Sequence, residues 1–131
     1  MACGEINADA PVLVRVQLQN PLDDALHWRR DDSGPLTGDV LAMITPNGRG
    51  VLVLLGDAPD VEATLARIRE QPVPAASKAG ALAQWRRNGA GSQILADLGA
   101  RRLRVLGTPR RQVGLAGFGL EVVDYAALPE R

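Results

Sequence analysis

Four arginines in the second half of the chain have the chemistry needed to bind an anion. They form two pairs, Arg86 with Arg87 and Arg110 with Arg111, and Thr108 lies close to the second pair. A guanidinium group binds phosphate or carboxylate through paired hydrogen bonds, to which a threonine hydroxyl can add one more. The sequence therefore offers these five residues as candidate anion ligands. The alternative is an ordinary set of solvated arginines.

Acidic residues are concentrated earlier in the chain. Neighbouring carboxylates attract magnesium or calcium, but the spacing here matches no calcium-binding loop. A solvated acidic loop is therefore favoured over a cation site for Asp23, Asp24, Asp31 and Asp32. His27 is the only histidine and has no second histidine or cysteine at ligand spacing, so a packed or surface role is favoured over a catalytic one.

Length and composition limit the classes of protein to which the chain can belong. The 131 residues fit a single domain, predicted over residues 4–131, and the formal net charge of zero gives no field that would attract nucleic acid or anionic membranes. Aromatic residues make up only 3% of the chain, too few for stacking on single-stranded nucleic acid. The single Cys3, placed in a frayed amino terminus, and the lack of a signal peptide or a long apolar segment indicate a cytoplasmic protein.

The order of predicted elements indicates an α/β domain. Alternation over residues 11–19 predicts a strand with one dry face, and the apolar run 50–56 predicts a strand buried on both faces. Further strands are predicted at 102–106 and 119–125. Helices are predicted as a short turn near Leu26, from about Pro35 to Ile44, from about Val61 to Ile68 and from about Ser92 to Leu98, with a flexible loop at 72–81. Strands alternating with helices favour a mixed sheet with flanking helices and some parallel pairing.

Glycines precede the last predicted helix, in the segment Gly89-Ala90-Gly91-Ser92. Free amides at a helix amino terminus attract phosphate, so this segment could form an anion cradle. A structural role, in which the glycines fit a turn, is favoured because glycine tolerates conformations that other residues avoid.

Three segments together resemble the GTP cyclohydrolase II family. Residues 89–128 resemble the end of the family sequence, residues 4–16 resemble its GDISGDEPVLVRV segment, and residues 47–55 resemble EGRGVLLYL. The resemblance implies the fold of that family, with zinc and magnesium as its cofactors. It also implies that this chain is truncated at its amino terminus relative to the family.

The positions that correspond to the family's zinc ligands contain no cysteine. When the family pattern RVHSECLTGD…RCDCG is aligned without a gap between Arg15 and Gly50, its three cysteines fall on Asn20, Asp31 and Ser33. Zinc in such a site is held by thiolates, which an amide, a carboxylate and a hydroxyl do not replace. The resemblance thus predicts that the metal site is lost and that no cofactor is bound.

Other family elements are also altered. The triphosphate-binding REGRGIGL element has no counterpart after residues 50–56, and the family's catalytic aspartate and arginine correspond to Gln84 and Arg86. Arg86 is therefore a remnant of the catalytic pair. Thr108, Arg110 and Arg111 correspond to the family's TNNPRK element, shortened by one residue.

The leading functional hypothesis is a catalytically inactive cyclohydrolase-like module that supports the assembly or stability of a riboflavin-pathway synthase. Fused proteins that resemble this chain place such a domain after a 3,4-dihydroxy-2-butanone 4-phosphate synthase, which implies the synthase and a second copy of this chain as partners. Two alternatives remain open: an active GTP cyclohydrolase II, which would release formate and pyrophosphate from GTP, and a sensor in which the arginines bind GTP or a phosphate weakly. No nucleic acid or membrane partner is predicted.

Overall fold

A five-stranded mixed sheet forms the centre of the molecule. The computed structural model describes residues 1–19, 21–27, 35–56, 61–69, 89–109 and 115–128. The strand order is β1-β3-β2-β4-β5, with β2 to β5 parallel and β1 antiparallel to β3. This arrangement confirms the predicted α/β class. The strands are β1 (Ala2–Cys3), β2 (Val12–Leu18), β3 (Gly50–Leu55), β4 (Arg102–Leu106) and β5 (Glu121–Ala126).

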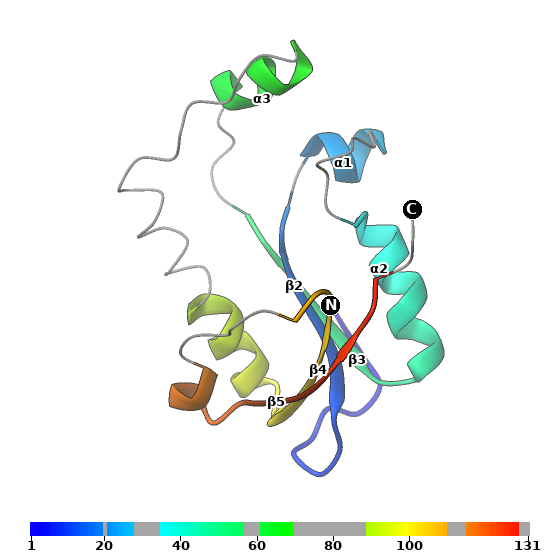
Figure 1. Ribbon diagram of the computed structural model, residues 1–131, viewed down its shortest axis with the longest axis vertical. Helices are drawn as coiled ribbons and strands as arrows, with labels where there is room; N and C mark the ends of the chain where they lie inside the picture. The colour runs from blue at the N-terminus through cyan, green and yellow to red at the C-terminus, as the bar shows by residue number, and fades with distance from the viewer. Residues whose placement is uncertain (20, 28–34, 57–60, 70–88, 110–114, 129–131) are drawn as a thin grey trace.

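Helices cover both faces of this sheet. A helix over residues 89–97 packs on one face and α2 on the other, which gives three layers (Figure 1). The predicted loop 72–81 lies outside the described residues. Besides the helix over residues 89–97, the helical segments are α1 (Pro21–Leu26), α2 (Thr37–Ile44), η1 (Thr45–Asn47), α3 (Val61–Ile68) and η2 (Leu115–Phe118).

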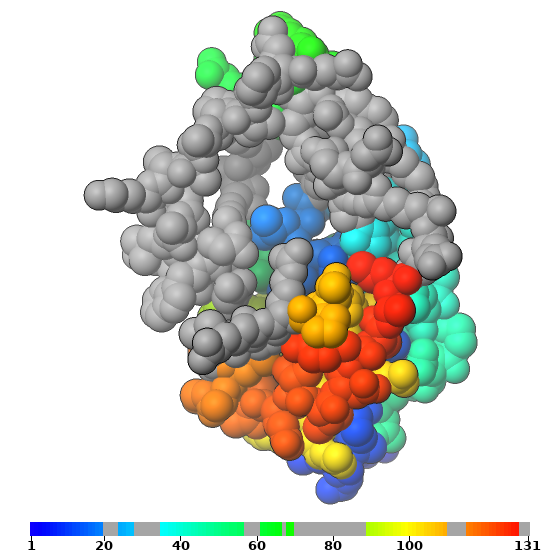
Figure 2. Space-filling model, viewed as in Figure 1, coloured from blue at the N-terminus to red at the C-terminus, as the bar shows by residue number. Residues whose placement is uncertain are grey.

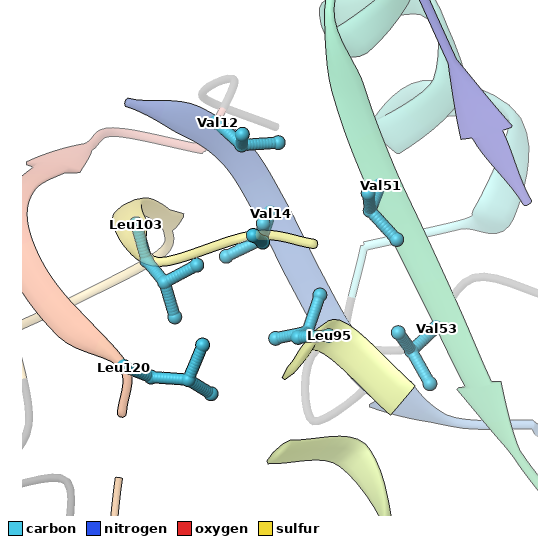
Figure 3. Packing of buried hydrophobic residues seen from close by; sticks show 8 residues of the cluster. Val12, Val14, Val51, Val53, Leu95, Leu103 and Leu120 are labelled. Atoms are coloured by element: carbon cyan, nitrogen blue, oxygen red, sulfur yellow. The ribbon is translucent and has the colours of Figure 1, made fainter. Parts of the chain in front are cut away.

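Aliphatic side chains fill the space between these layers. On one face, valines of β2 and β3 meet Leu95 of the 89–97 helix and Leu103 of β4 (Figure 3). On the other face, Leu13 and Leu52 pack against Val40 and Ile44 of α2. With so few aromatic residues, the core depends on branched aliphatic side chains, which suit buried parallel strands.

The prediction of one dry face for β2 is wrong for the first half of the strand. Val12, Leu13 and Val14 are all buried, whereas Val16 and Leu18 further along are 37% and 48% exposed. Because β2 is the central strand, helices cover both of its faces where it begins. The prediction also fails in the second half of the strand, where Val16 and Leu18 of the predicted dry face are exposed and the polar Arg15 and Gln17 are half-buried.

The amino terminus is ordered rather than frayed. Cys3 lies on β1 opposite Gly50, and its side chain is half-buried. The backbone amide of Leu52 donates to the Met1 carbonyl at 2.9 Å, and the Met1 amino group donates to the Leu52 carbonyl at 2.8 Å. A two-residue strand is too short to produce a periodic pattern, so these pairings leave no signal in the sequence.

Two helix predictions also need correction. The last helix already includes residues 89–91, so it begins earlier than Ser92. The predicted helix α3 is present, but Val61, Leu65 and Ile68 on its apolar stripe are 65%, 39% and 49% exposed. An apolar stripe at helical spacing therefore predicted the helix correctly but not the burial of that stripe.

The sheet edge at β5 is irregular. Val123 is the extra residue of a bulge, between the pairs Leu103–Val122 and Arg104–Asp124, and Arg104 and Asp124 form an exposed ion pair at 3.1 Å. Figure 2 shows the orange to red atoms of β5 at the molecular surface. Bulges and charges at an edge strand hinder pairing with another chain.

Among the described residues, no helix is long and apolar enough to cross a membrane.

Gly50 is expected to be essential for the packing of α2 on the sheet. A Cβ atom at this position would lie 2.5 Å from Ile44 Cγ2 and 2.8 Å from the Leu13 carbonyl oxygen. Gly50→Ala should therefore lower the free energy of unfolding by about 2 kcal/mol, as overpacked cores do. Gly38→Ala is the control, since nothing lies within 4 Å of its Cβ position, and it should stabilise α2 by about 0.5 kcal/mol. Equal urea midpoints for the two variants would contradict this packing.

Candidate functional site

The carboxyl ends of the parallel strands form the candidate site. The strands β2, β3, β4 and β5 run in the same direction, so the chain leaves all four at one edge of the sheet. Ligands of open α/β sheets bind outside this edge. Gln19, Gly56 and Gly107 are the first residues after β2, β3 and β4, respectively. We call this region the carboxyl edge.

Thr108 is the one candidate anion ligand that the structure describes. It is exposed and lies two residues after the end of β4, at the carboxyl edge. The other candidates, and the positions that match the zinc ligands, lie outside the described residues, so their convergence remains a prediction. They are Arg86, Arg87, Arg110, Arg111, Asn20, Asp31 and Ser33.

The structure describes the side chains of Asp24 and His27, two of the residues considered above as possible metal or catalytic residues. Asp24 is half-buried in α1 and accepts a hydrogen bond from the Thr37 hydroxyl. His27 is exposed and has a φ of 53°, a left-handed conformation that follows the end of α1. Within the described ranges, no three histidine, cysteine, aspartate or glutamate side chains form a group that could hold a metal. Asp31 and Asp32 lie outside those ranges.

A series of hydrogen bonds joins four polar side chains at the carboxyl edge. Arg15 Nε donates to Gln17 Oε1 at 3.4 Å, and Gln17 Nε2 donates to Thr37 Oγ1 at 3.3 Å. The Thr37 hydroxyl then donates to Asp24 Oδ1 at 2.6 Å. Arg15 Nη1 also donates to the Leu106 carbonyl at 2.9 Å. We call these four side chains the polar brace, since they connect β2 with α1, α2 and the end of β4.

Only part of the polar brace could be predicted from the sequence. Alternation along β2 places Arg15 and Gln17 on the same face, two residues apart, but nothing in the sequence connects them with Thr37 or Asp24. Those contacts depend on where α1 and α2 lie over the sheet. Residue types alone therefore do not identify Arg15, Gln17 and Thr37 as members of the site.

Gly107 is expected to tolerate no side chain. Its φ is +143°, and a Cβ atom there would lie 2.8 Å from Arg15 Nη1. Gly107→Ala should lower the free energy of unfolding by about 2 to 3 kcal/mol, because the backbone conformation favours glycine and the Arg15 guanidinium would have to move away from the Leu106 carbonyl. In Gly117→Ala, where nothing lies within 4 Å of the Cβ position, the urea midpoint should hardly change. Similar losses in both variants would contradict this account of Gly107.

The glycine segment before the last predicted helix does not form a separate loop. Gly89, Ala90, Gly91 and Ser92 are all helical, and a Cβ atom at Gly91 would lie 2.9 Å from Val16 Cγ1. Gly91 therefore allows the helix to approach β2 closely. The contact supports the structural role favoured from the sequence, with helix packing in place of a turn.

The thiol content of the chain does not fit the family's zinc site. Cys3 is the only cysteine, and it pairs with Gly50 where β3 begins. The carboxyl edge lies at the other end of β3, five residues further along, or about 17 Å at the usual rise of a strand. A site built from several thiolates cannot be assembled at the carboxyl edge from this chain.

Comparison with known proteins identifies the family. The GTP cyclohydrolase II family model matches residues 1–127. The 3,4-dihydroxy-2-butanone 4-phosphate synthase of Pseudomonas aeruginosa is 37% identical over 125 residues, covering 95% of this chain and 34% of that protein.

Two further relatives are riboflavin biosynthesis proteins. RibBA of Chlorobium phaeovibrioides is 36% identical over 134 residues, covering 95% of this chain and 33% of that protein. RibBA of Mycobacterium tuberculosis is 38% identical over 142 residues, covering 98% and 33%. The chain thus spans about one third of the length of these relatives. The chain belongs to the GTP cyclohydrolase II family of riboflavin biosynthesis.

Proposed function

We propose that this domain does not hydrolyse GTP and instead supports the assembly or stability of a 3,4-dihydroxy-2-butanone 4-phosphate synthase. The observation behind the proposal is that the chain has a single cysteine. Cys3 lies on β1 opposite Gly50, where β3 begins, and the carboxyl edge lies where β3 ends. The resemblance puts Asn20, Asp31 and Ser33 where the family has cysteines. Without thiolates to bind zinc, the domain has no Lewis acid to activate the water that attacks the purine ring.

Changes in the other family elements support the same proposal. The resemblance assigns triphosphate binding to an arginine- and glycine-rich element after β3, where this chain continues with Gly56-Asp57-Ala58-Pro59. It also assigns a catalytic aspartate to the position of Gln84. An amide cannot exchange a proton as a carboxylate does, so Arg86 would act without its acidic partner.

The relatives suggest the synthase as the partner. One relative is named for the synthase, and the region similar to this chain makes up about one third of it. The remaining two thirds of such a protein offer a folded neighbour for this domain. We place the synthase, as a fused domain or a separate chain, and a second copy of this chain among its partners.

A test of the supporting role uses the full chain and the synthase region of the Pseudomonas aeruginosa relative. The two proteins should migrate together in sedimentation velocity, and the half-life of synthase activity on heating should lengthen when this chain is added. A folded protein of similar size that does not belong to the family serves as the control. Independent sedimentation and an unchanged half-life would rule out the supporting role.

The position of Thr108 favours a second candidate, a sensor of nucleotides or phosphates. This exposed residue lies at the carboxyl edge, two residues before Arg110 in the sequence. Calorimetry with GTP and with ribulose 5-phosphate should then show binding that weakens in Arg110→Gln. No heat with either ligand at millimolar concentration would eliminate this candidate.

A further inference from the structure

The helix α1 is too short to be stable alone. It spans the six residues Pro21–Leu26, and isolated helices of this length do not persist in water. Hydrophobic burial gives it little support at its carboxyl end, because Ala25 is exposed and Leu26 is 70% exposed. Contacts other than apolar packing must therefore help to hold this end of α1 against the rest of the domain.

The Thr37 hydroxyl connects α1 to the sheet. It accepts a hydrogen bond from Gln17 Nε2 and donates one to Asp24 Oδ1. A threonine hydroxyl can do both at once, because it has one donor hydrogen and two acceptor lone pairs. The 2.6 Å bond to Asp24 has a carboxylate acceptor, and such bonds are shorter and stronger than neutral ones. Thr37 is also the first residue of α2, so the same atom joins two helices and a strand.

The Arg15 end of the polar brace extends this connection to β4. Its guanidinium donates to Gln17 on the same strand and to the Leu106 carbonyl on the next strand. Gly107 follows Leu106 and leaves room for that guanidinium. Four segments that end or begin at the carboxyl edge are thus linked by side chains of the chain itself.

We propose that Thr37 is a positioning residue, which fixes α1 and the ends of β2 and β4 through the polar brace without a bound metal. The inference rests on the proposed function, since a domain without zinc must hold its carboxyl edge with its own groups. Each member depends on the next: when Thr37 loses its hydroxyl, Asp24 and Gln17 lose their connection. The brace should therefore behave as one coupled unit rather than as independent bonds.

Amide hydrogen exchange of Ala25 and Leu26, in the last turn of α1, measures whether α1 is held. Thr37→Val removes the hydroxyl and keeps the side-chain shape, and it should accelerate this exchange about tenfold, as expected for a lost hydrogen bond to a charged group. Asp24→Ala should accelerate the exchange at least as much. The double variant should exchange within about twofold of Asp24→Ala, because both substitutions remove the connection between Thr37 and Asp24.

Two further variants separate this inference from a general effect on α2. Thr45→Val makes the same substitution next to the other end of α2, where the hydroxyl donates to the Leu41 carbonyl, and should leave α1 exchange unchanged. Thr37→Ser keeps a hydroxyl and should retain most of the protection. An unchanged rate in Thr37→Val, or effects of Thr37→Val and Asp24→Ala that multiply to about a hundredfold, would overturn the brace.

A chelator distinguishes failure of this inference from failure of the proposed function. With excess EDTA, wild-type exchange at Ala25 and Leu26 should not change. Acceleration by EDTA would show that a metal holds the carboxyl edge, and would contradict both the brace and the loss of zinc. If EDTA leaves the exchange rate unchanged but the effects of Thr37→Val and Asp24→Ala multiply in the double variant, the brace is overturned and the proposed function is not.

Discussion

Leu52→Ala is expected to lower the free energy of unfolding by about 2 to 5 kcal/mol, the range for large cavities in well-packed cores. Leu52 is fully buried on β3 and packs with Val40 and Ile44 of α2. Because domains of this size are stable by only about 5 to 15 kcal/mol, the variant could lose half of its stability. Urea unfolding followed by circular dichroism measures the change.

A matched substitution outside the core checks the cause. Leu26 is 70% exposed, so Leu26→Ala should change the free energy of unfolding by less than about 0.5 kcal/mol. Leu52→Met keeps the side-chain volume and should fold even if the alanine variant does not, with a loss below about 1.5 kcal/mol. A loss below about 1 kcal/mol for Leu52→Ala would mean that α2 does not cover this face of the sheet.

Restoring three cysteines is expected to restore zinc binding. The triple variant Asn20→Cys, Asp31→Cys and Ser33→Cys should bind one zinc ion per chain with an apparent free energy of about 10 kcal/mol, as thiolate-rich sites do. That value corresponds to a Kd of about 50 nM. Competition with a chromophoric chelator at neutral pH measures the affinity, and elemental analysis gives the stoichiometry.

Cys3→Ser controls for the native thiol in this experiment. Neither the wild-type chain nor Cys3→Ser should retain zinc through gel filtration. Retention of one equivalent by the wild-type chain would contradict the loss of the site. Failure of the triple variant to bind would instead mean that the three positions are not those that match the family's ligands.

The strands and most helices could be predicted from the sequence because local patterns determine them. β4 begins and ends at the predicted residues, and β3 ends one residue before its predicted limit. The missed strand β1 has two residues, and only its partner β3 defines it. The start of the last helix was also missed, because helix packing on Val16 overrides the low helix propensity of Gly89 and Gly91.

The candidate site was less predictable than the fold. Residue types predicted an anion site of arginines and Thr108, and the structure describes only Thr108 among them. The polar brace was not predicted, because Gln17 and Thr37 lie 20 residues apart and Thr37 and Asp24 lie 13 apart. Contacts of this kind depend on the tertiary arrangement of α1 and α2, which periodicity and composition do not specify.

Aliphatic packing and internal hydrogen bonds hold the described part of the domain together. The two hydrophobic clusters lie on the two faces of the sheet and consist of aliphatic side chains. The carboxyl edge has internal hydrogen bonds that do not require a metal. If the zinc ligands are lost, as we propose, these contacts can still keep the domain folded, which a role in supporting a partner requires.

Formate release from GTP is the most direct test of the claim that the domain is catalytically inactive. The purified chain would be incubated with GTP, excess magnesium and excess zinc, beside an active cyclohydrolase of the family and a heat-killed sample. We predict a rate at least about 10⁴-fold below that of the active enzyme and equal to the heat-killed control, because the proposed loss of the zinc ligands removes zinc-dependent water activation. Formate release above that control, abolished by a chelator, would contradict the account and show that the chain assembles a zinc site from other residues.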